Sequence, residues 1–98
     1  MKKTKEIFKW WGKLPGDRAP RFYEASNARR VEIADGLVCF IYTHPAIKGF
    51  VVAEKVSGKR IGHGISEALA IKDAREAVAR VGVRRTIEIV LRDALGKR

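Results

Sequence analysis

The chain has a single cysteine, Cys39, among its 98 residues, so no disulfide can form within it. No apolar run approaches the roughly 20 residues that a membrane-spanning helix needs. The basic start of the chain is not followed by an apolar segment, so we expect no signal peptide. These absences predict a cytoplasmic protein that does not enter a membrane, with Cys39 as an inert core residue.

Motifs for enzyme chemistry are equally scarce. Two histidines and one cysteine match no zinc-binding spacing. There is no P-loop, and the glycines between Gly58 and Gly64 do not follow the dinucleotide-binding fingerprint. Ser66 lacks an identifiable general base. We therefore expect no metal, no cofactor and no catalytic residue, and an enzyme is the minority interpretation.

Acidic residues are few compared with basic ones: 11 Asp and Glu face 21 Lys and Arg, for a net charge of +10. Residues 1–30 contain nine basic and three acidic residues, residues 59–98 contain ten and five, and residues 31–58 contain two and three. The positive charge is therefore concentrated towards the two ends of the chain, where it would attract polyanions. The alternative is that a basic surface only keeps a small protein in solution.

Three basic clusters are the candidate nucleic-acid-binding residues. They lie in the N-terminal segment, at the tip of a predicted hairpin, and after the main predicted helix. Hairpin tips and helix ends project basic groups beyond the scaffold, where they can contact phosphates. No helix-turn-helix pattern is present, so no base-specific readout is predicted. The candidate residues are Lys5, Lys9, Lys13, Lys59, Arg60, Arg84 and Arg85.

The range 49–81 predicts two strands followed by a helix. Apolar alternation on both sides of Gly58 indicates a β-hairpin. A loop made of Gly58 and Lys59 would place Val56 opposite Ile61, with the apolar residues on one face of the hairpin.

The helix that follows has clear ends. Ser66 suits the N-cap position and Gly82 the position after the last turn. Its apolar face is mostly alanine, so the helix can approach the strands closely, and Gly62 and Gly64 would leave room for it. The residues of this face are Ala70, Ile71, Ala74, Ala77, Val78 and Val81.

The N-terminal segment 1–14 predicts a basic amphipathic helix, because its apolar residues recur at helical spacing. Trp10 and Trp11 would dock this helix on the sheet. Alternatives for them are a groove of a partner, an anionic membrane surface, or stacking against exposed bases. Phe22 and Tyr23 follow a proline-containing connector and are either a lid over the core edge or exposed aromatics.

Asp35-Gly36 predicts a hairpin turn between strands 29–34 and 37–43. Ala34 would then face Leu37, and Val31 would face Phe40, with the second strand covered on both sides. Thr86 to Leu95 shows helical spacing, with a strand as the alternative. The predicted fold is one α+β domain, 1–98: an N-terminal amphipathic helix, a four-stranded antiparallel meander, and one long and one short C-terminal helix. An edge strand could pair between subunits, so the oligomeric state stays open.

The run from Gly62 to Ser66, followed by spaced alanines, resembles the Gly-x-Gly-x-Ser pattern of double-stranded-RNA-binding domains. The resemblance covers only the strand-to-helix junction. It implies that the glycines, the serine and the alanines pack the helix on the sheet, and that RNA is a candidate ligand. The lysines that follow the serine in that family are replaced here by Glu67 and Ala68, and Ile71 fills another basic position, so the family's phosphate contacts are not reproduced.

Three functions are expected, in this order. The first is a small non-enzymatic module that binds nucleic acid, or a nucleoprotein complex, through its basic N- and C-terminal regions. The second is a protein-binding inhibitor or adaptor of the mobile-element (phage) type, such as an anti-defence protein, whose basic surface covers an acidic surface of its partner. The third is a toxin-like small ribonuclease using His63, which the predicted register places opposite Glu54, a carboxylate able to orient the imidazole.

Overall fold

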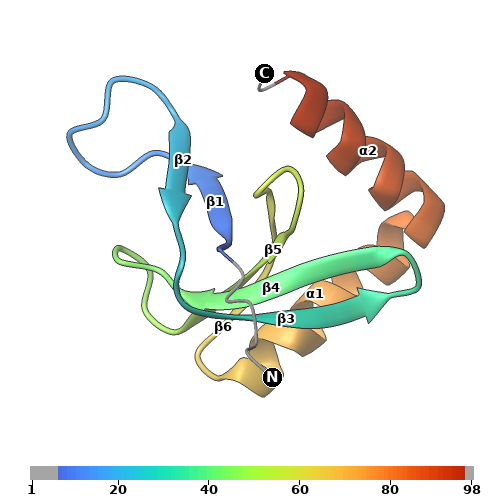
Figure 1. The fold of residues 1–98 in the computed structure, drawn as a ribbon. Coiled ribbons are helices and arrows are strands. Elements are labelled where there is room, and N and C mark those ends of the chain that lie inside the picture. Colours follow the sequence, from blue (N-terminus) through green and yellow to red (C-terminus); the bar gives the residue numbers. More distant parts are fainter. Residues whose placement is uncertain (1–6, 97–98) are drawn as a thin grey trace, which may run out of the picture.

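The computed structural model describes residues 7–96, which form an α+β fold (Figure 1). Four strands form one antiparallel sheet in chain order, β3-β4-β5-β6, and two form a separate antiparallel sheet, β1-β2. None of the helices in this range is long and apolar enough to cross a membrane. The elements are β1 (Lys9–Gly12), β2 (Arg21–Glu24), β3 (Ser26–Ala34), β4 (Leu37–Thr43), β5 (Phe50–Glu54), β6 (Arg60–Gly64), α1 (Glu67–Val81) and α2 (Val83–Gly96).

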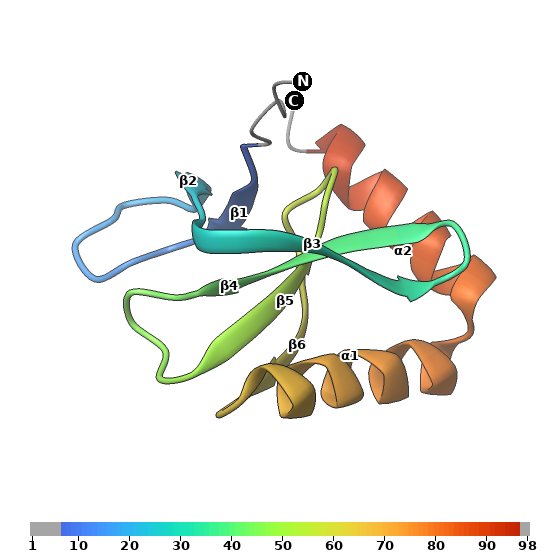
Figure 2. The same cartoon turned by 60° about the horizontal axis from the view of Figure 1, so that its bottom comes forward.

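The four-stranded sheet is covered on both faces, by α1 on one side and by the β1–β2 sheet on the other (Figure 2). Strand β4 is central, as predicted. Cys39 and Ile41 belong to the core beneath α1, whereas Phe40 and Tyr42 belong to the core beneath β1 and β2. Burial raises the pKa of the Cys39 thiol to about 12, so this cysteine is protonated at neutral pH.

Helix α1 has the predicted ends, and its predicted face is buried at Ala70, Ala74 and Val78, whereas Val81 at the end of the helix is 49% exposed. The Ser66 hydroxyl accepts from the Leu69 N–H at 3.2 Å, and the Gly82 N–H donates to the Val78 carbonyl at 2.7 Å. Helix and sheet approach so closely that a Cβ atom on Gly62 would lie 2.5 Å from the Ala74 nitrogen. Glycine on the strand and alanine on the helix therefore act together to let the two backbones pack closely.

The predicted N-terminal helix is wrong where the structure describes it, because residues 9–12 form strand β1. Alternation explains this: Phe8 and Trp10 are buried, at 5% and 3% exposed, while Lys9 and Trp11 lie on the other side of the strand. Packing of both buried rings against Phe40 and its neighbours outweighs the helical spacing of the apolar residues. Residues 1–6, including Lys5, lie outside the described range.

The β3–β4 hairpin has its predicted turn but not its predicted register. Ala34 faces Leu37 as expected, and a bulge between Glu32 and Ala34 then shifts the pairing by one residue. Val31 consequently lies opposite Cys39 rather than Phe40, on the side of the sheet that packs against α1. A bulge inserts one unpaired residue and is not visible in apolar alternation.

The loop of the β5–β6 hairpin is longer than predicted. Val52 pairs with Gly62, and Val56 is 49% exposed instead of facing Ile61. The cause is Glu54, which is buried and accepts hydrogen bonds from the backbone N–H groups of Val56 (2.8 Å) and Ser57 (2.7 Å). These side-chain bonds hold a wide turn that competes with further strand pairing.

The chain after Gly82 forms helix α2, so the helix is confirmed over the strand alternative. It begins three residues before the predicted start and, with 14 residues against 15 in α1, it is not the short helix that was predicted. The Thr86 hydroxyl donates to the Gly82 carbonyl at 2.9 Å, within the first turn. Thr86, Val90 and Ala94 are buried, at a spacing of one helical turn. The helix therefore attaches to the body along one narrow stripe.

Candidate nucleic-acid interface

The β1–β2 sheet has an inner and an outer face of different character. Inside, Trp10 stacks on Tyr23 with ring centres 4.7 Å apart. Outside, Trp11 pairs with Phe22 across the two strands, edge to face, at 4.8 Å. Phe22 is 39% exposed and Trp11 is half-buried. The outer face thus presents an aromatic pair to solvent.

The tip of the β5–β6 hairpin lies against β1. The Trp11 N–H donates to the Gly58 carbonyl at 2.9 Å. Gly58 has φ +70°, and a Cβ atom there would lie 2.8 Å from both the Lys9 oxygen and the Trp11 nitrogen. Only glycine fits this contact, which brings Lys59 at the hairpin tip beside Lys9 on β1.

Four of the predicted site residues therefore belong to the two segments that meet at this contact: Lys9 in β1, Lys13 just after it, and Lys59 and Arg60 at the hairpin tip. All four are exposed, and within residues 7–96 none of them forms an ion pair with a carboxylate. Glu24 lies opposite Lys9 in the strand register.

The other nearby carboxylate, Asp17, is already engaged. The Tyr23 hydroxyl donates a hydrogen bond to this carboxylate, and the Leu14 N–H donates a second one at 2.8 Å. Both stabilise the charged form, so the pKa of Asp17 lies below its usual value. Arg21 is 3.8 Å from Asp17 and has its guanidinium 4.7 Å from the Tyr23 ring centre. The cluster retains an excess of positive charge.

Arg60 lies on the same side of the sheet as an aromatic cluster around His44. The His44 ring is 4.4 Å from Trp10, and its Nδ1 accepts from the Ala46 N–H at 2.9 Å. Burial lowers the pKa of His44, and the charge of Arg60 lowers it further. Burial also raises the pKa of Tyr42. A neutral His44 carries no positive charge to oppose Arg60.

Arg84 and Arg85 do not join this group. They lie in the first turn of α2, next to the end of α1, whereas the β5–β6 tip lies beside the later turns of α2 (Figure 2). Arg85 is 4.0 Å from Glu88. The structure therefore divides the seven predicted residues into a group of four, a separate pair, and Lys5, which is outside the described range.

The expected partner of His63 is wrong. His63 pairs with Val51, and its Nε2 lies 3.0 Å from the Lys48 carbonyl oxygen, while Glu54 is used by its own turn. The His63 backbone N–H donates to Asp73 of α1 at 3.0 Å. Glu54, the carboxylate on which the ribonuclease hypothesis rested, therefore does not lie opposite His63. Within residues 7–96 no group of three potential metal ligands gathers.

Sequence reasoning missed the outer aromatic pair. The signal was available: Trp10-Trp11 and Phe22-Tyr23 are adjacent aromatics on either side of a turn containing proline and glycine, which is what a two-faced hairpin requires. Comparisons with family models, with curated proteins and with solved structures found no match to this chain. The resemblance to double-stranded-RNA-binding domains stays a prediction, and function must be inferred from geometry and charge.

Proposed function

We propose that the chain is a small non-enzymatic module that binds single-stranded nucleic acid, free or within a nucleoprotein complex, without reading base edges. The observation that supports this proposal is the contact between Gly58 and β1, which brings the hairpin tip that carries Lys59 and Arg60 against the strand that carries Lys9 and leads to Lys13. Cations from two different segments come together there, and among residues 7–96 none of them forms an ion pair with a carboxylate. Such a group suits a phosphate backbone.

The aromatic pair supports a single strand over a duplex. Bases stacked inside a duplex cannot lie on a protein ring, whereas the bases of a single strand can, at about 1–3 kcal/mol for each stacked base. Phe22 offers exposed ring surface next to the cations of β1. In this arrangement the lysines and Arg60 contact phosphates, and a base stacks on Phe22, whose ring is supported by Trp11.

A binding titration tests the proposal. Fluorescence anisotropy would follow labelled oligodeoxythymidine, oligouridine and a DNA duplex at about 50 and 200 mM salt. We expect both single strands to bind more tightly than the duplex, with affinity falling steeply as salt rises. Phe22→Ala should weaken single-strand binding about tenfold, the loss of roughly one stacked base.

Two results would count against it. No binding to any of the three probes at the lower salt concentration would remove nucleic acid as the ligand. Equal affinity for strand and duplex, unaffected by Phe22→Ala, would leave a charge-driven interaction and remove the stacking contact.

A further inference from the structure

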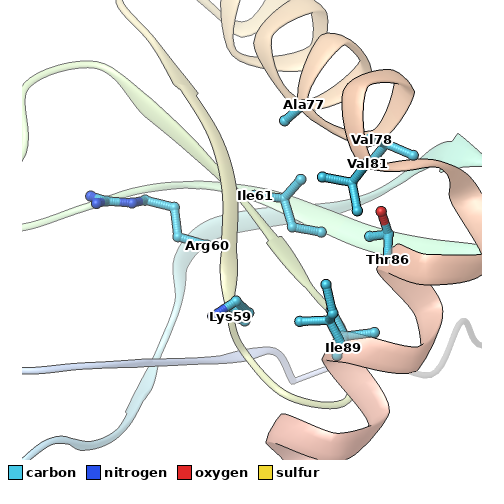
Figure 3. A pocket seen from close by; sticks show the side chains of 9 residues that line it. Lys59, Arg60, Ile61, Ala77, Val78, Val81, Thr86 and Ile89 are labelled. Atoms are coloured by element: carbon cyan, nitrogen blue, oxygen red, sulfur yellow. The ribbon is translucent and has the colours of Figure 1, made fainter.

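A second candidate site borders the cationic group, in the angle between β6, α1 and α2, and Lys59 and Arg60 belong to its lining as well. A pocket of about 180 Å³ lies there. Figure 3 shows Ile61 on its strand side, Ala77 and Val81 on α1, and Ile89 on α2. Its walls are almost wholly apolar. An apolar cavity of about 150 Å³ can hold a benzene ring, so this pocket has room for one large apolar side chain.

The pocket is formed because α2 is held along one side only. Its buried stripe of Thr86, Val90 and Ala94 packs inward, and Ile89, which is half-buried, stands at the flank. Val81, at the end of α1, is 49% exposed. Apolar surface at the rim is therefore left open to solvent, where an incoming side chain could cover it.

Lys59 places a positive charge at the opening. Lys59 lies next to Ile89 at the mouth, while the Arg60 side chain points away from the pocket (Figure 3). Among the described residues, no acidic side chain lines the pocket. A neighbouring hollow of about 300 Å³ continues along α2 past Ile89 and adds Arg92 and one acid, Asp93. An apolar hollow with a cationic rim is complementary to an apolar group beside carboxylates.

We propose that this pocket docks an acidic segment of a partner protein, which inserts one large apolar side chain between α1 and α2 while its carboxylates face Lys59 and Arg92. A second copy of this chain fits less well, because two molecules of net charge +10 repel each other. A nucleobase would leave its polar edge against apolar walls, without hydrogen-bond partners. The pocket shares Lys59 with the proposed nucleic-acid surface, but its apolar walls on β6, α1 and α2 are argued independently of that proposal.

The test uses three labelled synthetic peptides: one of Asp and Ala residues with a central Trp, the same peptide with Ala in place of the Trp, and a Lys-for-Asp version. Binding is measured by fluorescence anisotropy at about 150 mM salt, where long-range attraction is screened. We expect the acidic Trp peptide to bind roughly tenfold more tightly than the acidic Ala peptide, through burial of the ring. The basic peptide should not bind.

Variants locate the site. Ala77→Leu fills the pocket and should abolish the advantage of the Trp peptide, whereas Ala79→Leu, the same change at an exposed position of α1, should preserve it. If Ala77→Leu does not fold, Val81→Glu at the exposed rim should repel the acidic peptide. Val83→Glu, which adds the same charge just outside the pocket, serves as its control.

Four outcomes would overturn the proposal. Equal binding of the two acidic peptides would mean that charge alone attracts them. An undiminished Trp advantage in Ala77→Leu or Val81→Glu would place binding elsewhere. Sedimentation that reveals a dimer dissociated by Ala77→Leu would make a second copy the occupant. Loss of oligodeoxythymidine binding in the folded Ala77→Leu variant would assign the pocket to a base.

Discussion

The two covers of the four-stranded sheet are built from opposite kinds of residue. Under α1 the contact is glycine against alanine, with backbone almost touching backbone. Under β1 and β2 it is aromatic against aromatic, with Phe8 stacked on Phe40 at 4.7 Å and Trp10 near Tyr42 at 6.0 Å. Both solutions fill the space between layers, the first by removing side chains and the second by interleaving large ones.

The covers also differ on their solvent sides. Helix α1 carries three acidic and three basic residues, and Glu67 at its start is paired with Arg29 of β3 at 2.5 Å. The β1–β2 cover and the hairpin tip beside it carry four cations that form no ion pair in the described range. One cover is electrostatically balanced and the other is not, and this difference is the reason why we propose the aromatic cover as the binding surface.

Removing the central ring of the aromatic cover should have the largest effect. Trp10→Ala deletes a side chain that is 3% exposed and contacts Tyr23 and His44. We expect a loss of about 4 kcal/mol in the free energy of unfolding, measured by urea denaturation. Phe22→Ala, on the outer face, should lose much less. Similar losses for the two variants would contradict the assignment of inner and outer faces.

The second-largest loss of stability should come from blocking the close approach of α1 to the sheet. Gly62→Ala adds a Cβ atom that would lie 2.5 Å from the Ala74 backbone nitrogen, so helix or strand must move, at a cost of about 1–3 kcal/mol. Gly96→Ala, where a Cβ atom would meet nothing within 4 Å, is the matched control. Thermal unfolding of both variants makes the comparison. Equal melting temperatures would mean that the helix is not packed so tightly.

The smallest effect concerns His44, which the aromatic cover keeps neutral. Because burial and then Arg60 lower its pKa in the folded state, the unfolded chain takes up a proton first as pH falls below about 6.5. Stability should be complete above that pH and should decline as pH falls towards the folded-state pKa. NMR titration of the ring should show the pKa rising in Arg60→Gln. An unchanged pKa would separate Arg60 from this cluster.

Much of the α1 side could be predicted from the sequence, because its signals are local. Ser66, Gly82 and the alanine spacing each act within a few residues of the chain. Gly62 and Gly64 indicated the close approach, since glycine in a strand leaves room for a neighbouring backbone. The turn of the β3–β4 hairpin is also specified locally, by the Asp35-Gly36 pair.

The other side could not be predicted, because non-local contacts decide it. Residues 7–14 satisfy both helical and alternating spacing, and only the partner rings on β4 select the strand. Glu54 fixes the β5–β6 loop through its side chain, which an apolar pattern does not record. The sequence offered these lysines only as separate candidates, and that Lys9 lies near Lys59 depends on β1 being a strand against Gly58.

The most direct measurement compares charge removal on the two covers, using anisotropy of labelled oligodeoxythymidine over a range of salt. Lys9→Gln with Lys59→Gln should lower affinity about tenfold and reduce the salt slope by about 0.7 for each cation removed. Lys72→Gln with Arg80→Gln on α1, an equal change in net charge, should leave both nearly unchanged, and Arg84→Gln with Arg85→Gln will report on the separate pair. Equal losses for the first two double variants would contradict the account, because net charge and not its placement would then govern binding.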